Sequence, residues 1–158
     1  MVDLEKYSGK WYEIFKIPFK WEQGCVKSTA NYEVLNTESI TLKNTCYFEN
    51  GKSYSRSGKG VINHYEEDEY EYENEDDVML KMTIEFTDGL PSDGPSPYWI
   101  HWTNYNFSVV GGPSEDHLWL LSRDENISKR ELVSFMSYVD ELGYDISRIE
   151  IQDNISVI

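Results

Sequence analysis

Near the start of the chain stands the stretch Gly9-Lys10-Trp11-Tyr12-Glu13-Ile14. Its aromatic and β-branched residues favour an extended strand, which we expect to run from Lys10 to Phe15. Successive side chains of a strand point to opposite faces. Trp11 and Phe15 are therefore expected to lie on the same face of this strand.

Alternation of apolar and polar residues continues beyond this stretch and predicts seven further strands. Turn-forming residues separate them, among them Glu49-Asn50-Gly51. The expected strands are 26–35, 39–48, 52–62, 78–86, 98–102, 107–110 and 117–122. Consecutive antiparallel strands with mostly short turns predict an all-β fold, an eight-stranded up-and-down β-barrel. A β-sandwich is the alternative, because periodicity alone does not separate the two.

The hydrophobic period changes after the last of these strands. Leu132, Phe135, Met136, Val139 and Leu142 recur at helical spacing. A capping box at the residue pair 128 and 131 and a glycine at 143 mark the two ends. We expect one C-terminal α-helix packed outside the barrel, then a short strand at 148–151, with the whole chain 1–158 forming a single domain.

Charge narrows the class of partner. The chain has 14 basic and 29 acidic residues, for a net charge of −15. Nine of the acidic residues fall between Glu66 and Asp77. Such a surface repels phosphate backbones, so nucleic-acid binding is not expected. The 12 Tyr, 6 Phe and 5 Trp suit strands and suit the wall of an apolar cavity equally well.

Targeting segments are absent from the sequence as it stands. The longest apolar run is Leu118-Trp119-Leu120-Leu121, whereas a membrane-spanning helix needs about 20 residues. The first residues, Met1 to Lys6, lack the apolar core of a signal peptide. We expect either a cytosolic protein or a mature form whose leader is not present in this chain.

Three separated motifs bear on the choice between barrel and sandwich. Gly9 and Trp11 form the first, and Arg123 after the eighth strand forms the third. The second is Thr103-Asn104-Tyr105, at the turn between the sixth and seventh strands. Together they resemble the lipocalin signature, and the likeness, closest to the bacterial lipocalin and apolipoprotein D branch, spans residues 3–151. Asn104 departs from the aspartate usual in the family but keeps a turn-forming side chain.

The resemblance implies a barrel whose closed end holds Trp11, with the Arg123 guanidinium stacked over its ring. The motif residues Gly9, Trp11, Thr103, Asn104, Tyr105 and Arg123 then identify the fold and carry no chemistry. It also implies binding and transport of a small hydrophobic ligand: a fatty acid, a lysophospholipid or a similar lipid. A bilin, retinoid or steroid carrier is the alternative.

Strand parity and the family pattern together name the expected cavity wall. Trp11 points inward, so Phe15 should too, and counting back by twos from Arg123 adds three more residues. The full set of expected ligand-binding residues is Phe15, Tyr32, Leu42, Asn44, Arg56, Met82, Ile84, Tyr98, Ile100, Trp102, Phe107, Val109, His117, Trp119 and Leu121. A mostly apolar wall with a few polar groups is typical of a small-molecule site.

Arg56 is the informative polar member of this wall, since a buried cation without a partner is costly. Three interpretations stay open: it pairs with an inward Glu13, it receives an anionic headgroup, or an error in register leaves it on the surface. His117 is expected at the rim of the open mouth, not as a metal ligand.

Catalysis has little support in the sequence. His64, His101 and His117 show no metal-ligand spacing, and neither a phosphate loop nor a nucleophile elbow is present. We therefore expect no enzyme, no metal and no cofactor. Some lipocalin relatives are enzymes, one of which uses a cavity cysteine, and the inward parity of Cys46 keeps that alternative open.

The two cysteines bear on the compartment. Cys25 begins the second strand and Cys46 lies near the end of the third, so the hairpin across Asn36-Thr37 makes them near neighbours. Some bacterial lipocalins are similar, with a disulfide at matching positions. A disulfide here implies an oxidising compartment, so a secreted, periplasmic or outer-membrane location. Two reduced thiols are the alternative.

The connections between strands alternate between the two ends of an up-and-down barrel. The loops 16–25 and 87–97 are expected at the open end, where the second would act as a lid. The acidic run 66–77 is expected at the closed end, as a solvated extension that does not gate the ligand. The remaining partners expected are a transient membrane at the open end and, at most, a second copy in a weak dimer.

Overall fold

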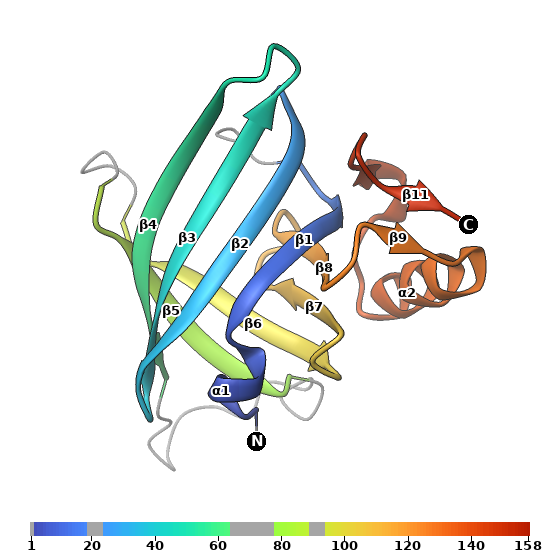
Figure 1. Cartoon of the computed structure of the whole chain (residues 1–158). Coiled ribbons are helices and arrows are strands. Elements are labelled where there is room, and N and C mark those ends of the chain that lie inside the picture. The colour runs from blue at the N-terminus through green and yellow to red at the C-terminus, as the bar shows by residue number, and fades with distance from the viewer. Residues whose placement is uncertain (1, 19–23, 64–77, 89–93) are drawn as a thin grey trace.

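The computed structural model describes residues 2–18, 24–63, 78–88 and 94–158 (Figure 1). A short helix, α1 (Leu4–Tyr7), precedes the strands. The eight strands of the barrel are β1 (Gly9–Lys16), β2 (Cys25–Asn36), β3 (Ser39–Phe48), β4 (Ser53–Ile62), β5 (Leu80–Phe86), β6 (Ser96–Thr103), β7 (Phe107–Gly111) and β8 (Leu118–Ser122). All eight expected strands are therefore present, with ends that differ by a few residues.

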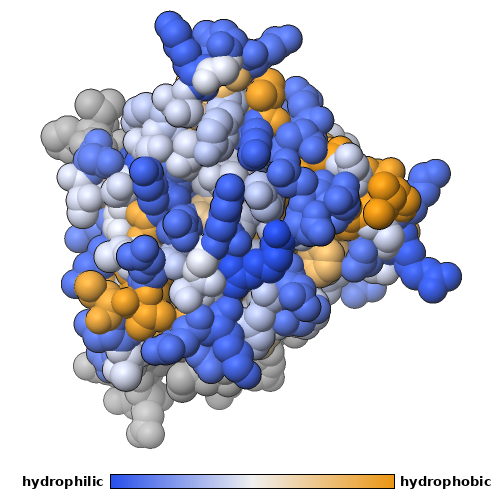
Figure 2. Space-filling model, viewed as in Figure 1, coloured by the Kyte–Doolittle hydropathy of each residue, from blue (hydrophilic) through white to orange (hydrophobic). Residues whose placement is uncertain are grey.

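Each of these strands pairs antiparallel with its neighbours in sequence, and β1 also pairs with β8. Tyr12 lies opposite Ser122 and Glu13 opposite Leu121 in that last pairing. The sheet is thus closed into a barrel, and the sandwich alternative is wrong. Figure 2 shows mainly hydrophilic side chains over the strands β2 to β4, because their apolar residues face the interior.

The segment after the barrel consists of β9 (Asn126–Ile127), α2 (Lys129–Glu141), η3 (Ile146–Arg148), β10 (Glu150–Ile151) and β11 (Ser156–Val157). Ser128 and Glu131 form the expected capping box at the start of α2. The helix lies outside the barrel, beside β7 and β8 (Figure 1). The expected C-terminal strand is β10, which pairs with the end of β1.

Two apolar clusters lie on the two sides of the barrel wall. The inner one includes Trp11, Tyr32, Leu42, Met82 and Ile100. The outer one is formed between the wall and α2, and it includes Ile14, Phe15, Val109, Leu118, Leu120 and Val139. The strands β1, β7 and β8 are therefore covered by apolar side chains on both faces.

Four of the expected cavity residues lie in this outer cluster, so their inward orientation was wrongly predicted: Phe15, Trp102, Phe107 and Val109. The register of β1 against β8 shifts between Glu13 and Phe15, and that of β6 against β7 shifts between Ile100 and Trp102. Such an irregularity reverses the side-chain alternation beyond it. The Phe135 ring of α2 contacts two of these residues, with its centroid 5.7 Å from that of Trp102 and 4.9 Å from that of Phe107.

Candidate functional site

The barrel encloses a cavity of about 320 Å³. Nine of the expected residues line it: Tyr32, Leu42, Asn44, Arg56, Ile84, Tyr98, His117, Trp119 and Leu121. Met82 and Ile100 belong to the inner cluster but not to the cavity wall, and both are fully buried. The wall is mainly apolar, and the volume of the cavity falls in the range that is usual for small-molecule sites.

The wall also contains residues that were not on the expected set. Glu13, Ala30 and Phe86 share the strand parity of Trp11, Tyr32 and Ile84, so alternation alone was enough to find them. Val110 was missed because the shift between β6 and β7 reverses the faces of β7. Residues 94–97 also line the cavity, and they are the last four residues of the expected lid.

Two charged side chains, Arg56 and Glu13, line this cavity. Arg56 is 5% exposed and Glu13 is 6% exposed. The guanidinium carbon of Arg56 lies 3.9 Å from the centroid of the Phe86 ring, a cation–π contact. Asn44 is its partner in the register of β3 and β4. The surface interpretation of Arg56 is thus wrong, and the cavity contains a guanidinium held against its wall.

Near the mouth, the rings of His117 and Trp119 are stacked with their centroids 6.1 Å apart. Both residues line the cavity. Within the described part of the chain, no three His, Cys, Asp or Glu side chains come together as a metal site would require. The His117 ring thus lies in the cavity wall beside Trp119, and its role at the rim stays a prediction.

A group of hydroxyl side chains lies at the closed end of the cavity. The Tyr7 hydroxyl is 2.8 Å from the Ser108 hydroxyl and 2.8 Å from that of Tyr98, which donates to Tyr32 over 2.8 Å. Burial raises the pKa of Tyr7 to about 12 and holds the pKa of Tyr32 and Tyr98 well above the usual value. All three phenols are therefore neutral at physiological pH.

Because Tyr7 is buried as a neutral phenol, we expect the free energy of unfolding to fall at high pH. Since burial raises the pKa of the folded Tyr7, its contribution to stability is present below about pH 10 and is lost as the pH rises through about 12. The loss attributable to Tyr7 amounts to about 3 kcal/mol over this window. Urea unfolding at pH 8, 10 and 11 measures it. Tyr7→Phe should flatten the pH dependence, whereas the exposed control Tyr54→Phe should not, and equal slopes in all three proteins would contradict the assignment.

The motif residues build the closed end. The Arg123 guanidinium carbon lies 3.7 Å from the centroid of the Trp11 ring. The same group donates hydrogen bonds to the carbonyl oxygens of Lys6, Tyr7, Lys10 and Tyr105, at 2.9–3.2 Å. One side chain thus joins α1, β1 and the turn after β6, which closes the floor.

The turn 103–106 keeps its hydrogen bonds in spite of the departure at Asn104. The Asn104 side-chain oxygen accepts from the backbone N–H groups of Asn106 and Phe107, at 3.0 and 2.8 Å. The Thr103 hydroxyl donates to the Phe107 carbonyl. Gly9 has φ +99°, and a side chain there would meet Arg123 at 3.3 Å. Gly9, Thr103 and Asn104 thus shape the backbone at the closed end, and none of them lines the cavity.

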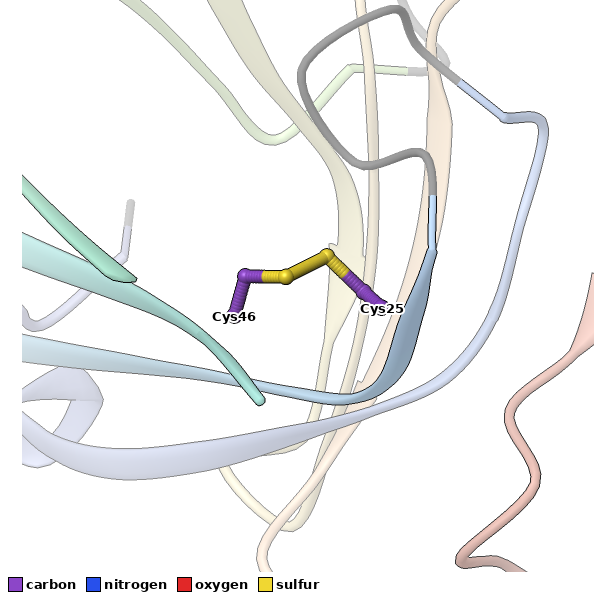
Figure 3. Close-up of a disulfide and its surroundings, with 2 residues drawn as sticks. All are labelled: Cys25 and Cys46. Carbon is purple, nitrogen blue, oxygen red and sulfur yellow. A yellow bond between two sulfur atoms is a disulfide. The ribbon is translucent and has the colours of Figure 1, made fainter. Parts of the chain in front are cut away.

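Cys25 and Cys46 form a disulfide, with their Cα atoms 5.4 Å apart (Figure 3). The figure shows the bond linking the first residue of β2 to the end of β3. The expected pairing is confirmed, and the alternative of two reduced thiols is wrong. The Cys46 sulfur is therefore not a free nucleophile in this structure.

Comparison with known proteins identifies the family. The model of the lipocalin-like domain matches residues 2–154. The chain belongs to the lipocalin family. A putative lipocalin of Acanthamoeba polyphaga mimivirus is 30% identical over 94% of this chain and 82% of its own length. The outer membrane lipoprotein Blc of Vibrio cholerae is 29% identical over 93% of this chain and 80% of its own.

Mouse apolipoprotein D is 26% identical over 96% of this lipocalin and 76% of its own length. Among solved structures, apocrustacyanin C2 superposes with a TM-score of 0.71 at 15% identity, over 98% of this chain and 79% of its own, which supports the fold alone. The family and its fold support binding of a small hydrophobic ligand. In the described residues, no helix is long and apolar enough to span a membrane.

Proposed function

We propose that this lipocalin carries an amphiphilic lipid, a fatty acid or a lysophospholipid, with its apolar part inside the barrel. The observation that carries the proposal is Arg56: a guanidinium only 5% exposed, in the wall of a mainly apolar cavity. An arginine pairs well with a carboxylate or phosphate through charge-assisted hydrogen bonds. Each buried methylene group of the ligand contributes about 0.8 kcal/mol.

Several further features support this assignment and its setting. One relative is named an outer membrane lipoprotein, and the Cys25–Cys46 disulfide suits an oxidising compartment. We infer an extracytoplasmic protein, a monomer or weak dimer that acts as one domain over residues 1–158 and whose open end meets membranes transiently.

The acidic run 66–77 lies outside the described residues, as do residues 89–93 of the lid.

Two other functions are separated from this one by simple measurements. A bilin or retinoid would give the purified protein a visible or near-ultraviolet absorption band, and a steroid would be found by mass spectrometry of an organic extract. An enzyme that uses Cys46 would need the disulfide reduced, so its turnover would appear only with a reductant and would vanish in Cys46→Ser.

Binding should change the fluorescence of Trp119, because this ring lines the cavity near its mouth. Titration with fatty acids of increasing length should alter the emission saturably, with longer chains binding more tightly. Trp119→Ala should weaken binding by about 1–3 kcal/mol, the free energy of burying one large side chain. Trp99→Ala is the matched control, since the ring of Trp99 lies outside the cavity wall, 4.2 Å below the Lys81 ammonium. Unchanged emission with every lipid would contradict the proposal.

The role of Arg56 is tested with headgroups in the same assay. Arg56→Met keeps an unbranched side chain but removes the charge. It should weaken binding of a fatty acid by about tenfold or more and leave binding of the matching fatty alcohol nearly unchanged. Equal losses for both ligands would show that Arg56 only packs against Phe86, and the lipid headgroup would then have to be placed elsewhere.

A further inference from the structure

The hydroxyl chain at the closed end of the cavity has a direction. Its four members are almost completely buried: Ser108 is 0% exposed, Tyr7 1%, Tyr32 3% and Tyr98 8%. Each hydroxyl has one hydrogen to donate. Tyr98 donates its hydrogen to Tyr32, so in the contact of 2.8 Å between Tyr7 and Tyr98 the donor must be Tyr7. By the same count, Ser108 donates to Tyr7.

Tyr32 therefore ends the chain with its own hydrogen still to donate. None of the residues that the structure describes accepts a hydrogen bond from the Tyr32 hydroxyl. The Tyr32 oxygen already accepts a hydrogen bond from Tyr98, so what is left over is its donor, and a buried donor without an acceptor is costly. The free direction of this hydroxyl matters for ligands because Tyr32 lines the cavity, as does Tyr98, whereas Tyr7 and Ser108 are not part of its lining.

Tyr32 and Arg56 lie at different depths in the barrel. Tyr32 lies opposite Leu42, which lies opposite Gly58 in the register of β2, β3 and β4. The neighbouring inward-facing row contains Arg56 and is two residues nearer the open end, a rise of about 7 Å along a strand. A ligand whose headgroup is held by Arg56 can thus present a different part of its chain to Tyr32.

The surroundings of Tyr32 favour a neutral partner. Glu13 lines the same cavity, and its negative charge adds to burial in raising the pKa of the Tyr32 phenol. A second anion at this point would be repelled by the same charge. A carbonyl, hydroxyl or ether oxygen accepts a hydrogen bond without adding charge, whereas a saturated hydrocarbon chain leaves the Tyr32 donor unsatisfied.

We propose that the deep part of the cavity recognises a neutral oxygen atom in the ligand, a hydroxyl, keto or ether group on its chain, through the hydroxyl of Tyr32. This inference rests on the proposed function, because it takes the ligand to be an amphiphile held by Arg56 in the same cavity. It narrows the ligand class from plain saturated lipids to oxygenated ones.

The test compares octadecanoic acid with hydroxy- and keto-octadecanoic acids that carry the oxygen at successive positions along the chain. Affinity for the wild-type protein, measured by the tryptophan emission, should peak at one region of the chain, about tenfold above that of the plain acid. This series needs no variant. Equal affinity of the plain acid and of every oxygenated acid would overturn the inference and leave the proposed function standing, whereas no binding of any acid would overturn both.

A pair of variants that differ only in one hydroxyl assigns the effect to Tyr32. In Tyr98→Phe the hydrogen of Tyr32 is still available, so the preference for the oxygenated acid should persist. In the double variant Tyr32→Phe/Tyr98→Phe the ratio of the two affinities, oxygenated acid to plain acid, should fall to about one. Urea unfolding of both variants checks that they fold. A double variant that folds and keeps the preference would show that another group binds the oxygen and would overturn the inference.

Discussion

Arg123→Ala is expected to lower the free energy of unfolding by about 4 kcal/mol, a loss typical of breaking a network of hydrogen bonds. The guanidinium donates to four carbonyl oxygens that belong to α1, β1 and the turn after β6, and it stacks on Trp11. Alanine leaves these carbonyls to water and exposes the indole ring. Chemical denaturation followed by far-ultraviolet circular dichroism measures the change.

Arg123→Lys separates charge from geometry. Lysine keeps the positive charge but lacks the planar fork, so it reaches fewer of the carbonyl oxygens and should recover about half of the loss. Arg148→Ala is the matched control: its partner Asp116 is exposed on the surface, and an exposed ion pair contributes little. Equal losses in Arg123→Ala and Arg148→Ala would contradict the role of Arg123 in closing the floor.

Removing the Cys25–Cys46 disulfide is expected to destabilise the protein by about 3 kcal/mol. The bond closes a loop between residues 21 positions apart, and a cross-link over that length restricts the unfolded chain by about this amount. The double variant Cys25→Ser/Cys46→Ser and the reduced wild-type protein should agree within error. Thermal and urea unfolding, with and without reductant, measure the effect.

The serine variant is its own control for the reductant, because it has no disulfide to reduce. Reductant should therefore leave its unfolding midpoint unchanged while it lowers that of the wild-type protein. Intact mass after alkylation should show one reducible bond in the wild-type protein. Identical midpoints for the oxidised and reduced wild-type protein would show that the bond does not contribute to stability.

The strands, the C-terminal helix and the cysteine pair could be predicted from the sequence because each has a local cause, whereas the closed end was implied by the resemblance to the lipocalin signature. β2 to β5 expose one face to solvent, so apolar and polar residues alternate along them and reveal both the strand and its inward side. The Ser128 capping box satisfies backbone groups within a single turn. The hairpin between β2 and β3 brings Cys25 and Cys46 together by simple counting along two paired strands.

The tertiary structure alone decided which side chains of β1, β6 and β7 enter the cavity. These strands lie between the cavity and α2, so both faces are apolar and alternation carries no information about side. Ile14 and Phe15 are adjacent and both completely buried. The register shifts that turn Phe15 and Trp102 outward come from pairing with distant strands, which no local pattern records.

The direction of the hydroxyl chain is decided in the same way. Tyr7, Tyr32, Tyr98 and Ser108 come from α1, β2, β6 and β7, and nothing in their spacing along the chain announces a contact. The sequence by itself, with its likeness to the lipocalin signature, predicted a barrel with a mostly apolar interior and left the side of Arg56 open. Only the packing of four separate elements decided that Tyr32 ends this chain and donates to none of the described residues, because a hydrogen bond depends on where atoms meet and not on their order in the chain.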